Sequence, residues 1–301
     1  MKSHRTTLIQ AAVVAGVTAL ALTSCASGGT ASAPTASASA SIAVDKEAAS
    51  LLPASIADAG SITIGASLDY PPDNFLEDDG KTPTGYMVDM LAAVGKKLGV
   101  KIEYSRVDFA SVLTGIEGGR YDAGISYLDT KQRQDVVDMV DVYGVAQSFL
   151  IMADSKWTGF PCGKKVGVGA GSTEEAILEN LSKTECTDKG KQAVDILTFP
   201  SNPQSQTAMS SGRVDAVFSA TAPAAWAVKD SDGNFKIGGK PFKAASGLTG
   251  IAVGRAHEGL AEALQKAVQS LIDDGTYKKI LDKWDVAGLA IDASTINAAT
   301  E

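Results

Sequence analysis

Two stretches of the chain, "GGRYDAGIS" at residues 118–126 and "SGRVDAVFS" at residues 211–219, share the phrase Gly-Arg-x-Asp-Ala. Each phrase follows a segment with helical spacing of apolar residues and runs into a short strand-forming segment. An earlier pair also corresponds, since "ITIGAS" at residues 62–67 resembles "VGVGAGS" at residues 166–172. The same landmarks in the same order predict two similar lobes of alternating strands and helices.

The segments between these landmarks favour an α/β fold with crossover helices. Met87, Leu91, Val94 and Leu98 recur at helical spacing, so a helix is predicted there. Further helices are predicted over residues 108–119 and 130–140, over the segment that starts at Ser172, and from Glu258 to Trp284.

Loops at the carboxyl ends of the strands are the expected ligand-binding positions in such a fold, because helix N-termini converge there. Two facing lobes also predict a cleft between them, and two chain crossings predict a hinge. The loops in question span residues 68–75, 126–133, 169–173 and 219–223.

The predicted organisation has a leader, a linker, two lobes and a tail. Lobe 1 is discontinuous, because the chain leaves it for lobe 2 and returns. The segments are a signal peptide (1–24), a lipid-anchored flexible tether (25–57), lobe 1 (58–149 and 250–290), lobe 2 (150–249, with hinge crossings near 148–153 and 246–251) and a C-terminal tail (291–301).

The N-terminal segment predicts export. Lys2 and Arg5 precede an apolar run over residues 8–22 that is too short for an ordinary membrane span. The run meets "LTSC" at residues 22–25, which resembles the lipobox of bacterial lipoproteins, so cleavage before Cys25 and acylation of its thiol are expected. The alternative is an ordinary secretory cleavage site beside an incidental cysteine. The small-residue segment that follows favours an anchor with a tether.

Charge and cysteine content limit the classes of binding partner and of site that the chain can have. The formal net charge is −8, with 27 basic and 35 acidic residues, which argues against binding to nucleic acid. Beyond Cys25 the chain has Cys162 and Cys186, and an even pair in an exported protein predicts a disulfide. Free thiols and a metal site are the alternatives, the second disfavoured because His257 is the only histidine beyond the signal segment.

Taken together, the motifs resemble the extracytoplasmic solute-binding proteins of ABC importers, in the family 3 branch that binds polar amino acids. The resemblance runs from about residue 62 to residue 284 and rests on the following stretches: "ASLDYPP", "GYMVDMLAAVGKKLGVKIEY", "GGRYDAGIS", "TKQRQDVVD", "VGVGAGST", "SGRVDAVFS" and "DGTYKKILDKW".

This resemblance implies a type II periplasmic binding protein fold that closes on a small carboxylate solute, an amino acid or a derivative. It also implies delivery to an ABC permease and its ATPase from outside the cytoplasm, with the lipid on Cys25 holding the protein at the membrane. The chain is then expected to be a monomer with no enzymatic activity, no cofactor and no metal.

The resemblance also assigns ligand-binding residues. Arg133 matches the arginine that pairs with the ligand's α-carboxylate, a role that suits its planar fork. From the residues alone, a salt bridge to Asp135 or Asp138 is the alternative. Thr130 is expected to cap a helix, and Tyr70 could also be ordinary core. The complete predicted set is Tyr70, Phe75, Ser126, Tyr127, Arg133, Ser172, Thr173, Ala220 and Thr221.

Three positions depart from the family pattern. Asp73 stands where an aromatic is usual, the loop over residues 126–133 is shorter, and Ala220 replaces the acid that usually holds the ligand's ammonium. Another carboxylate, Asp73 or Asp129, could replace that acid. The favoured hypothesis is instead a ligand without a free primary α-amine, N-substituted or cyclic, held against Tyr70, Phe75, Tyr127 and Trp226.

Two other functions fit the same fold. Some exported enzymes share it, and Asp69, Asp73 and Asp129 could supply carboxylate chemistry, whereas a Ser-His-Asp or Cys-His site is disfavoured because His257 lies far from the loops. A sensor domain that contacts a membrane receptor is the second alternative. A nucleotide loop is disfavoured because "GVGAGST" has neither the dinucleotide spacing nor a lysine after its glycines.

Overall fold

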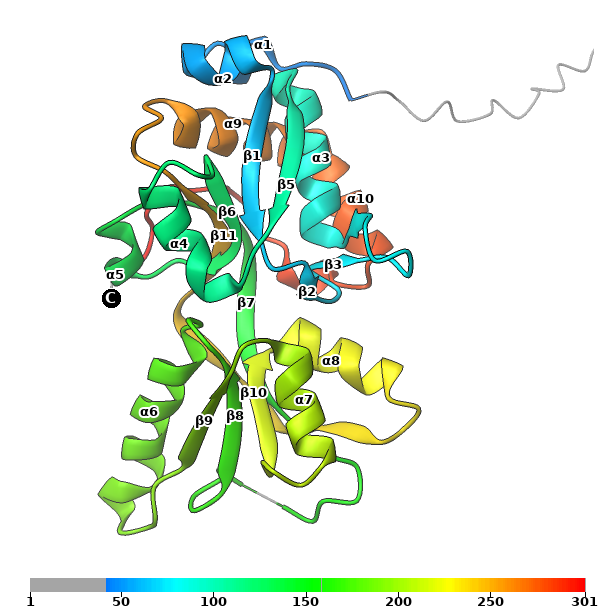
Figure 1. Ribbon diagram of the computed structural model, residues 1–301, viewed down its shortest axis with the longest axis vertical. Helices are drawn as coiled ribbons and strands as arrows, with labels where there is room; N and C mark the ends of the chain where they lie inside the picture. Colours follow the sequence, from blue (N-terminus) through cyan, green and yellow to red (C-terminus); the bar gives the residue numbers. More distant parts are fainter. Residues whose placement is uncertain (1–41, 158, 301) are drawn as a thin grey trace, which may run out of the picture. The chain divides into compact units, whose positions relative to one another are not determined.

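The computed structural model describes residues 42–157 and 159–300, and the part from Ile42 onward forms one compact unit (Figure 1). The predicted signal peptide, Cys25 and the tether up to residue 41 lie outside the described residues. Within the described part, no helix has the length and apolar character needed to cross a membrane.

Lobe 1 is built on three parallel strands in the order β5-β1-β6. The predicted apolar face of α3, including Met87 and Leu91, is buried against them. Its elements are β1 (Ser61–Ala66), α3 (Tyr86–Leu98), β5 (Lys101–Arg106), α4 (Phe109–Glu117) and β6 (Ala123–Leu128), with the small sheet β2 (Asp69–Tyr70), β3 (Asn74–Leu76) and β4 (Pro83–Thr84) after β1.

Lobe 2 repeats that arrangement, with parallel strands in the order β9-β8-β10. Apart from the η1 turn (Thr187–Lys189) in lobe 2 and the small β2–β4 sheet in lobe 1, its elements follow the same order as those of lobe 1. They are β8 (Lys165–Gly169), α6 (Glu174–Glu185), β9 (Asp195–Phe199), α7 (Asn202–Ser210), β10 (Ala216–Ala220) and α8 (Thr221–Asp230). The internal repetition predicted from the sequence is therefore confirmed.

The repeated Gly-Arg-x-Asp-Ala phrase has the same structural role in each lobe. Gly119 and Gly212 have φ angles of +67° and +73°, a region that favours glycine, and each lies just beyond a helix. Three residues later, Asp122 accepts a hydrogen bond from the Thr63 amide (2.7 Å), and Asp215 accepts one from the Lys165 amide (2.9 Å). The phrase thus ends a helix and fixes the next strand beside the first strand of its lobe.

Two long antiparallel strands, β7 (Asp138–Met152) and β11 (Phe235–Val253), run through both lobes. In lobe 1, β11 pairs with β6, whereas in lobe 2, β7 pairs with β10. The exchange of neighbours falls between residues 144 and 147 in β7 and between residues 243 and 248 in β11. The first crossing lies slightly earlier in the chain than the predicted 148–153, and the second overlaps the predicted 246–251.

The predicted helix over residues 130–140 is only partly formed, because a turn and the start of a strand replace its second half. Only α5 (Lys131–Gln134) is helical, and β7 begins at Asp138. Val136, Val137 and Val140 disfavour helix because they are β-branched, and Val137 and Val140 are fully buried here.

The ends of the described chain pack on lobe 1. Helices α1 (Lys46–Ala49) and α2 (Ala54–Ala59) bury Ala48 and Ile56, so the segment predicted as a tether up to residue 57 is folded from Asp45 onward. The sequence pattern was too short to reveal helices of four and six residues. The C-terminal elements are α9 (Leu260–Asp273), α10 (Thr276–Lys283) and η2 (Ala287–Leu289).

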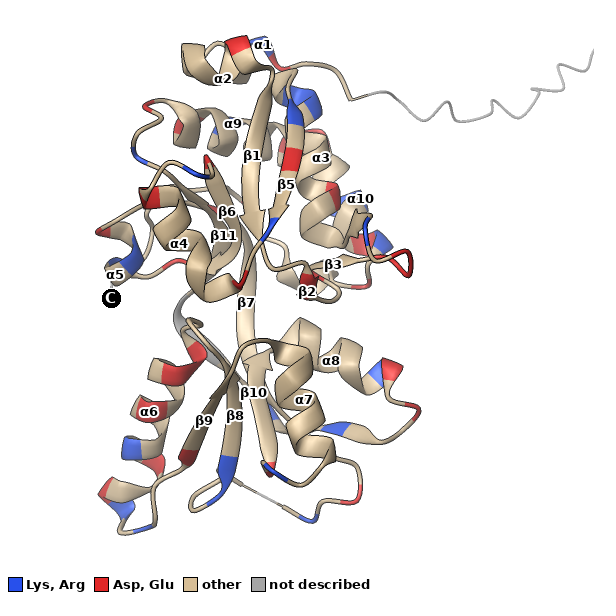
Figure 2. Cartoon of the chain, in the orientation of Figure 1, with Lys and Arg blue, Asp and Glu red and all other residues tan. Residues whose placement is uncertain are grey.

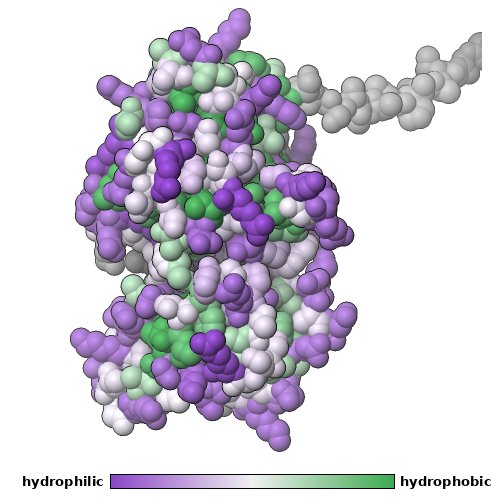
Figure 3. All heavy atoms as spheres, viewed as in Figure 1, coloured by the Kyte–Doolittle hydropathy of each residue, from purple (hydrophilic) through white to green (hydrophobic). Residues whose placement is uncertain are grey.

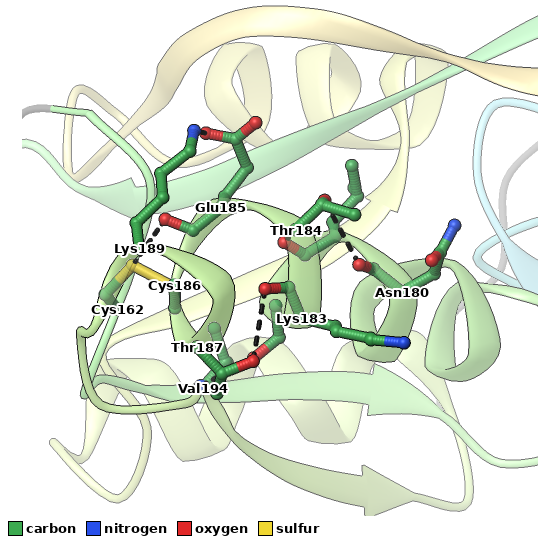
Figure 4. Close-up of a disulfide and its surroundings, with 11 residues drawn as sticks. Cys162, Asn180, Lys183, Thr184, Glu185, Cys186, Thr187, Lys189 and Val194 are labelled. Atoms are coloured by element: carbon green, nitrogen blue, oxygen red, sulfur yellow. Dashed lines mark hydrogen bonds and ion pairs between the residues drawn. A yellow bond between two sulfur atoms is a disulfide. The ribbon is translucent and has the colours of Figure 1, made fainter.

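The predicted disulfide is present, joining Cys162 to Cys186 at the C-terminal end of α6 (Figure 4). The sheet strands themselves carry few charges, and most Asp, Glu, Lys and Arg lie on helices and loops (Figure 2). Hydrophilic side chains accordingly spread over both lobes on the face seen in Figure 3.

Candidate functional site

Arg133 lies at the C-terminal end of β6, on the short helix α5, and is only 8% exposed. Thr130, the predicted helix cap, accepts a hydrogen bond from the Arg133 amide (3.3 Å). Its guanidinium donates to Leu128 O (3.0 Å) and lies 4.7 Å from the centre of the Tyr127 ring. Burial lowers the pKa of Arg133.

The same guanidinium reaches lobe 2, where Nη2 donates to Gly171 O (3.3 Å). Counted over the described residues, the bonds to Leu128 and Gly171 occupy two of its five N–H donors. Asp138 pairs instead with Arg255 (3.6 Å), so the alternative of a surface salt bridge for Arg133 is not seen.

The facing wall in lobe 2 is the turn between β8 and α6. Ser172 donates to Gly169 O (2.7 Å), and Thr173, the residue before α6, makes no side-chain capping bond. Gly171 has a φ of +75°, and a Cβ there would come within 2.8 Å of Ala110 Cα in lobe 1. Glycine is required at this point because the two lobes approach so closely.

Glu174 is the first residue of α6 and was not predicted as a site residue. Burial raises the pKa of its carboxyl, while the Ser172 hydroxyl and the Arg133 charge act in the opposite direction. The start of a helix favours a negative charge because its first N–H groups are unpaired. Glu174 therefore lies at the positive end of α6.

The wall in lobe 1 centres on Asp73, which is 1% exposed. Its carboxylate accepts hydrogen bonds from Asn74 Nδ2 (3.0 Å), the Ser126 hydroxyl and the Tyr143 hydroxyl, with Tyr86 also bonded to it. Burial raises the pKa of Asp73, and these hydrogen bonds oppose the shift. Donors around both oxygens already satisfy this carboxylate.

Tyr70 connects the walls, because its hydroxyl accepts a hydrogen bond from the Ala220 amide in lobe 2 (3.2 Å). Burial raises its pKa well above the usual range. Ala220 ends β10, so its methyl group lies at the strand end.

The cleft holds two adjoining hollows, of about 50 and 90 Å³, which share Tyr70, Ser126, Ser172 and Glu174 in their walls. Six predicted site residues line the first: Tyr70, Ser126, Arg133, Ser172, Thr173 and Ala220. Asp69 lines the second hollow.

The other three predicted site residues have different surroundings. Phe75 packs against Trp226 (ring centres 5.9 Å apart), a contact that joins the lobes beside the cleft. Tyr127 stacks on Phe109 beneath Arg133 (4.4 Å). Thr221 hydrogen bonds to Ser148 (2.8 Å).

Of the two carboxylates considered as replacements for the usual acid, Asp73 lines the first hollow. Asp129 is fully buried and bonds to Gln134 (2.9 Å) and to the Ala299 amide (2.9 Å), which places it at the C-terminal tail.

Sequence reasoning missed Glu174, Tyr86, Tyr143 and Gln147, all of which line the first hollow. A signal existed for Gln147, since it is a polar residue within a strand of apolar neighbours. The tyrosines gave none, because an aromatic in an apolar pattern is usually core. Among the described residues, no cluster of three or more His, Cys, Asp or Glu is placed to hold a metal.

Comparison with known sequences places this arrangement in context. The profile of the bacterial extracellular solute-binding proteins, family 3, matches residues 62–287. The arginine-binding protein ArgT of Corynebacterium glutamicum is 27% identical over 255 residues, covering 83% of each chain. The L-cystine-binding protein TcyJ of Escherichia coli is 26% identical over 238 residues, covering 76% of this chain and 84% of that protein.

Solved structures match the fold. An ancestral arginine-binding protein bound to arginine superposes with a TM-score of 0.66 at 30% identity, covering 75% of this chain and 98% of that one. An ancestral amino acid-binding protein, a precursor of cyclohexadienyl dehydratase, gives 0.65 at 25% identity, covering 76% and 97%. These matches confirm the predicted bilobal α/β fold of the type II periplasmic binding proteins.

Proposed function

The chain belongs to the bacterial extracellular solute-binding proteins, family 3, and from that premise we propose that it captures an amino acid or a related small carboxylate between its lobes. The loaded protein then delivers this solute to an ABC permease and its ATPase. A lipid on Cys25 anchors it to the outer face of the cell membrane, and the folded part acts as a monomer.

The observation that carries the proposal is the buried guanidinium of Arg133 facing the start of α6. A cation this deeply buried is costly unless it is paired with an anion. Among the described residues, the hydrogen bonds of its guanidinium go to the carbonyl oxygens of Leu128 and Gly171, and the Tyr127 ring lies 4.7 Å away. A carboxylate fits between the guanidinium fork and the free N–H groups of a helix N-terminus, because each offers hydrogen bonds to an anion.

The second hollow supports an amino acid with a polar or cationic side chain. It combines the carboxylates of Asp69 and Glu174 with the rings of Tyr70 and Phe109, a set that suits a delocalised cation. Arginine binding by the relative from Corynebacterium glutamicum and by the ancestral protein makes arginine the first solute to test.

An exported enzyme is the second candidate, because Asp73 is a buried carboxyl with a raised pKa in the cleft and one structural match is a dehydratase precursor. Incubating the protein with each solute that binds and following the solute by mass spectrometry separates the two functions. Recovery of unchanged solute supports a binding protein, and conversion supports an enzyme.

Replacing Arg133 by alanine tests the carboxylate site. We expect the dissociation constant of the bound solute to rise about 30-fold or more, because its carboxylate loses a buried partner. Calorimetry with solute identified by native mass spectrometry is the measurement. Arg120→Ala is the control, since that arginine of the same lobe is exposed. An Arg133→Ala protein that binds within threefold of wild type contradicts the assignment.

The proposed anchor is tested by Cys25→Ser. Without the thiol there is no acylation site, so the variant is expected in the soluble extracytoplasmic fraction and the wild type in the membrane fraction. Metabolic labelling with a fatty acid gives an independent readout. Membrane retention of the variant equal to that of wild type argues against the lipid.

A further inference from the structure

Gln147 is a buried polar side chain whose amide oxygen does not stabilise the fold through a hydrogen bond to a described residue. It is 1% exposed, it lines the first hollow, and its side-chain oxygen has no hydrogen-bond partner among the described residues. A carbonyl oxygen buried without a partner loses its bonds to water and gains nothing in return. Such an oxygen beside a ligand cleft indicates a donor that arrives with the ligand.

The position of Gln147 connects it to the missing acid. In the antiparallel pairing of β7 and β10, Gln147 lies directly opposite Ala220. The oxygen without a partner therefore belongs to the residue paired with the end of β10, where Ala220 presents only a methyl group.

The two carboxylates that line the first hollow, Asp73 and Glu174, already have partners. The oxygens of Asp73 take donors from Asn74, Ser126 and Tyr143. Glu174 sits at the start of α6, where the Ser172 hydroxyl and the charge of Arg133 act on it. Gln147 is left as the neutral acceptor next to Ala220.

We propose that the side-chain oxygen of Gln147 accepts an N–H from the amine of the ligand, and so selects solutes whose amine keeps at least one hydrogen. The idea rests on the proposed function, because it needs a ligand whose carboxylate is held at Arg133. A primary or a secondary amine satisfies this acceptor, including the amine of an N-methylated or cyclic amino acid. A quaternary amine does not.

The test compares matched ligands on matched variants. The probes are L-arginine and L-glutamine, each with its Nα-trimethyl derivative, which keeps the positive charge but has no N–H. The variants are wild type, Gln147→Met, which keeps the length of the side chain without the amide, and Ser148→Ala. Ser148 serves as the control because it is the next residue of β7 and bonds to Thr221 outside the first hollow.

For Gln147→Met we expect the dissociation constant of the parent amino acid to rise about tenfold and that of its trimethyl derivative to change less than twofold. Ser148→Ala should leave the ratio of the two constants as in wild type. Equal weakening of parent and derivative by Gln147→Met, or no weakening of either, overturns the inference and leaves the proposed function standing.

Thermal unfolding without ligand gives a second, independent readout. Gln147→Met removes a buried oxygen that lacks a partner, so its melting temperature should equal that of wild type or exceed it by about 2–4 °C. A clear decrease would show that the amide supports the fold, which overturns the inference. If no probe binds to wild type, the proposal that this protein binds amino acids fails separately, and this readout alone decides the role of Gln147.

Discussion

The two lobes share one strand order but are fastened in different ways. In lobe 1, residues 294–297 lie along β7, where the Asp141 amide bonds to Thr295 O (2.9 Å) and the Asn297 amide bonds to Met139 O (2.9 Å). In lobe 2, the Cys162–Cys186 disulfide closes a segment of 24 residues over β8 and α6. One lobe is held by hydrogen bonds from the chain end and the other by a covalent link.

The difference follows from how much apolar surface each lobe can bury. Lobe 1 has one large cluster, which joins α1, α2, α3, α9 and α10 to its strands, and a smaller one beneath α4, whereas both clusters of lobe 2 are small. Small cores leave a domain marginal, and a cross-link is a common compensation. The same topology therefore needs a covalent link in the lobe that has the smaller cores.

The largest expected effect comes from removing that link. In Cys162→Ala/Cys186→Ala, the closed segment of 24 residues gains freedom in the unfolded state, which costs about 3 kcal/mol of lobe 2 stability. Urea unfolding, followed by hydrogen exchange of β8 and β1, is the measurement. We expect β8 to lose protection and β1 to keep it. Equal loss in both strands would mean that the lobes unfold as one unit.

The fastening of lobe 1 is expected to respond to pH. Asp141 is buried beneath the tail, accepts a bond from Thr295 (2.6 Å), and burial raises its pKa to about 6. Its folded pKa lies above the unfolded value, so the stability it contributes is present at low pH and is lost as the pH rises from about 4 through 6.

Asp141→Asn should remove this dependence. Relative to wild type, the variant is expected to gain about 2 kcal/mol between pH 4 and pH 7, after allowance for solvent screening. Thermal unfolding of the two proteins across that range is the measurement, and Asp195→Asn, on a lobe 2 strand, is the exposed control. A constant difference between Asp141→Asn and wild type would contradict the raised pKa.

The smallest expected effects concern the two aspartates of the repeated Gly-Arg-x-Asp-Ala phrase. The side chain of Asp122 is 18% exposed and lies 3.0 Å from His257, whereas that of Asp215 is 48% exposed. Hydrogen bonds to charged groups count for more when they are buried, so Asp122→Ala should cost about 2 kcal/mol and Asp215→Ala about 1 kcal/mol or less. Chemical denaturation measures both. An equal cost would show that the amide contact alone determines the role.

Much of the fold could be predicted because its signals are local. The helical spacing in α3 is one such signal. The glycine and the aspartate of the repeated phrase are others, since each shapes the helix end or strand start within a few residues of its own position. Local patterns did not predict residues 130–140 correctly. The polar run "TKQRQD" is typical of a helix, whereas pairing within the sheet makes the chain a strand from Asp138 onward.

The candidate site was partly predictable for a related reason. Arg133, Ser172 and Ala220 lie in loops that the strand pattern already identified. Gln147 and Tyr143 reach the cleft from the long strand β7, and Tyr86 reaches it from the first position of α3. Only their packing in three dimensions brings them to Asp73 or Ala220. Phe75 was predicted from its place beside Tyr70, and it contacts Trp226 without lining either hollow.

The path of β11 through both lobes has a consequence for synthesis, which proceeds from the N-terminus. Once Lys243 has left the ribosome, lobe 2 has all its strands, but β6 of lobe 1 still lacks the partner that residues 249–253 provide. Until then β6 presents an unpaired edge, the kind of surface that draws stray strands into aggregates. The later part of the sequence thus completes the earlier lobe, and a nascent chain is most vulnerable in the half that was made first.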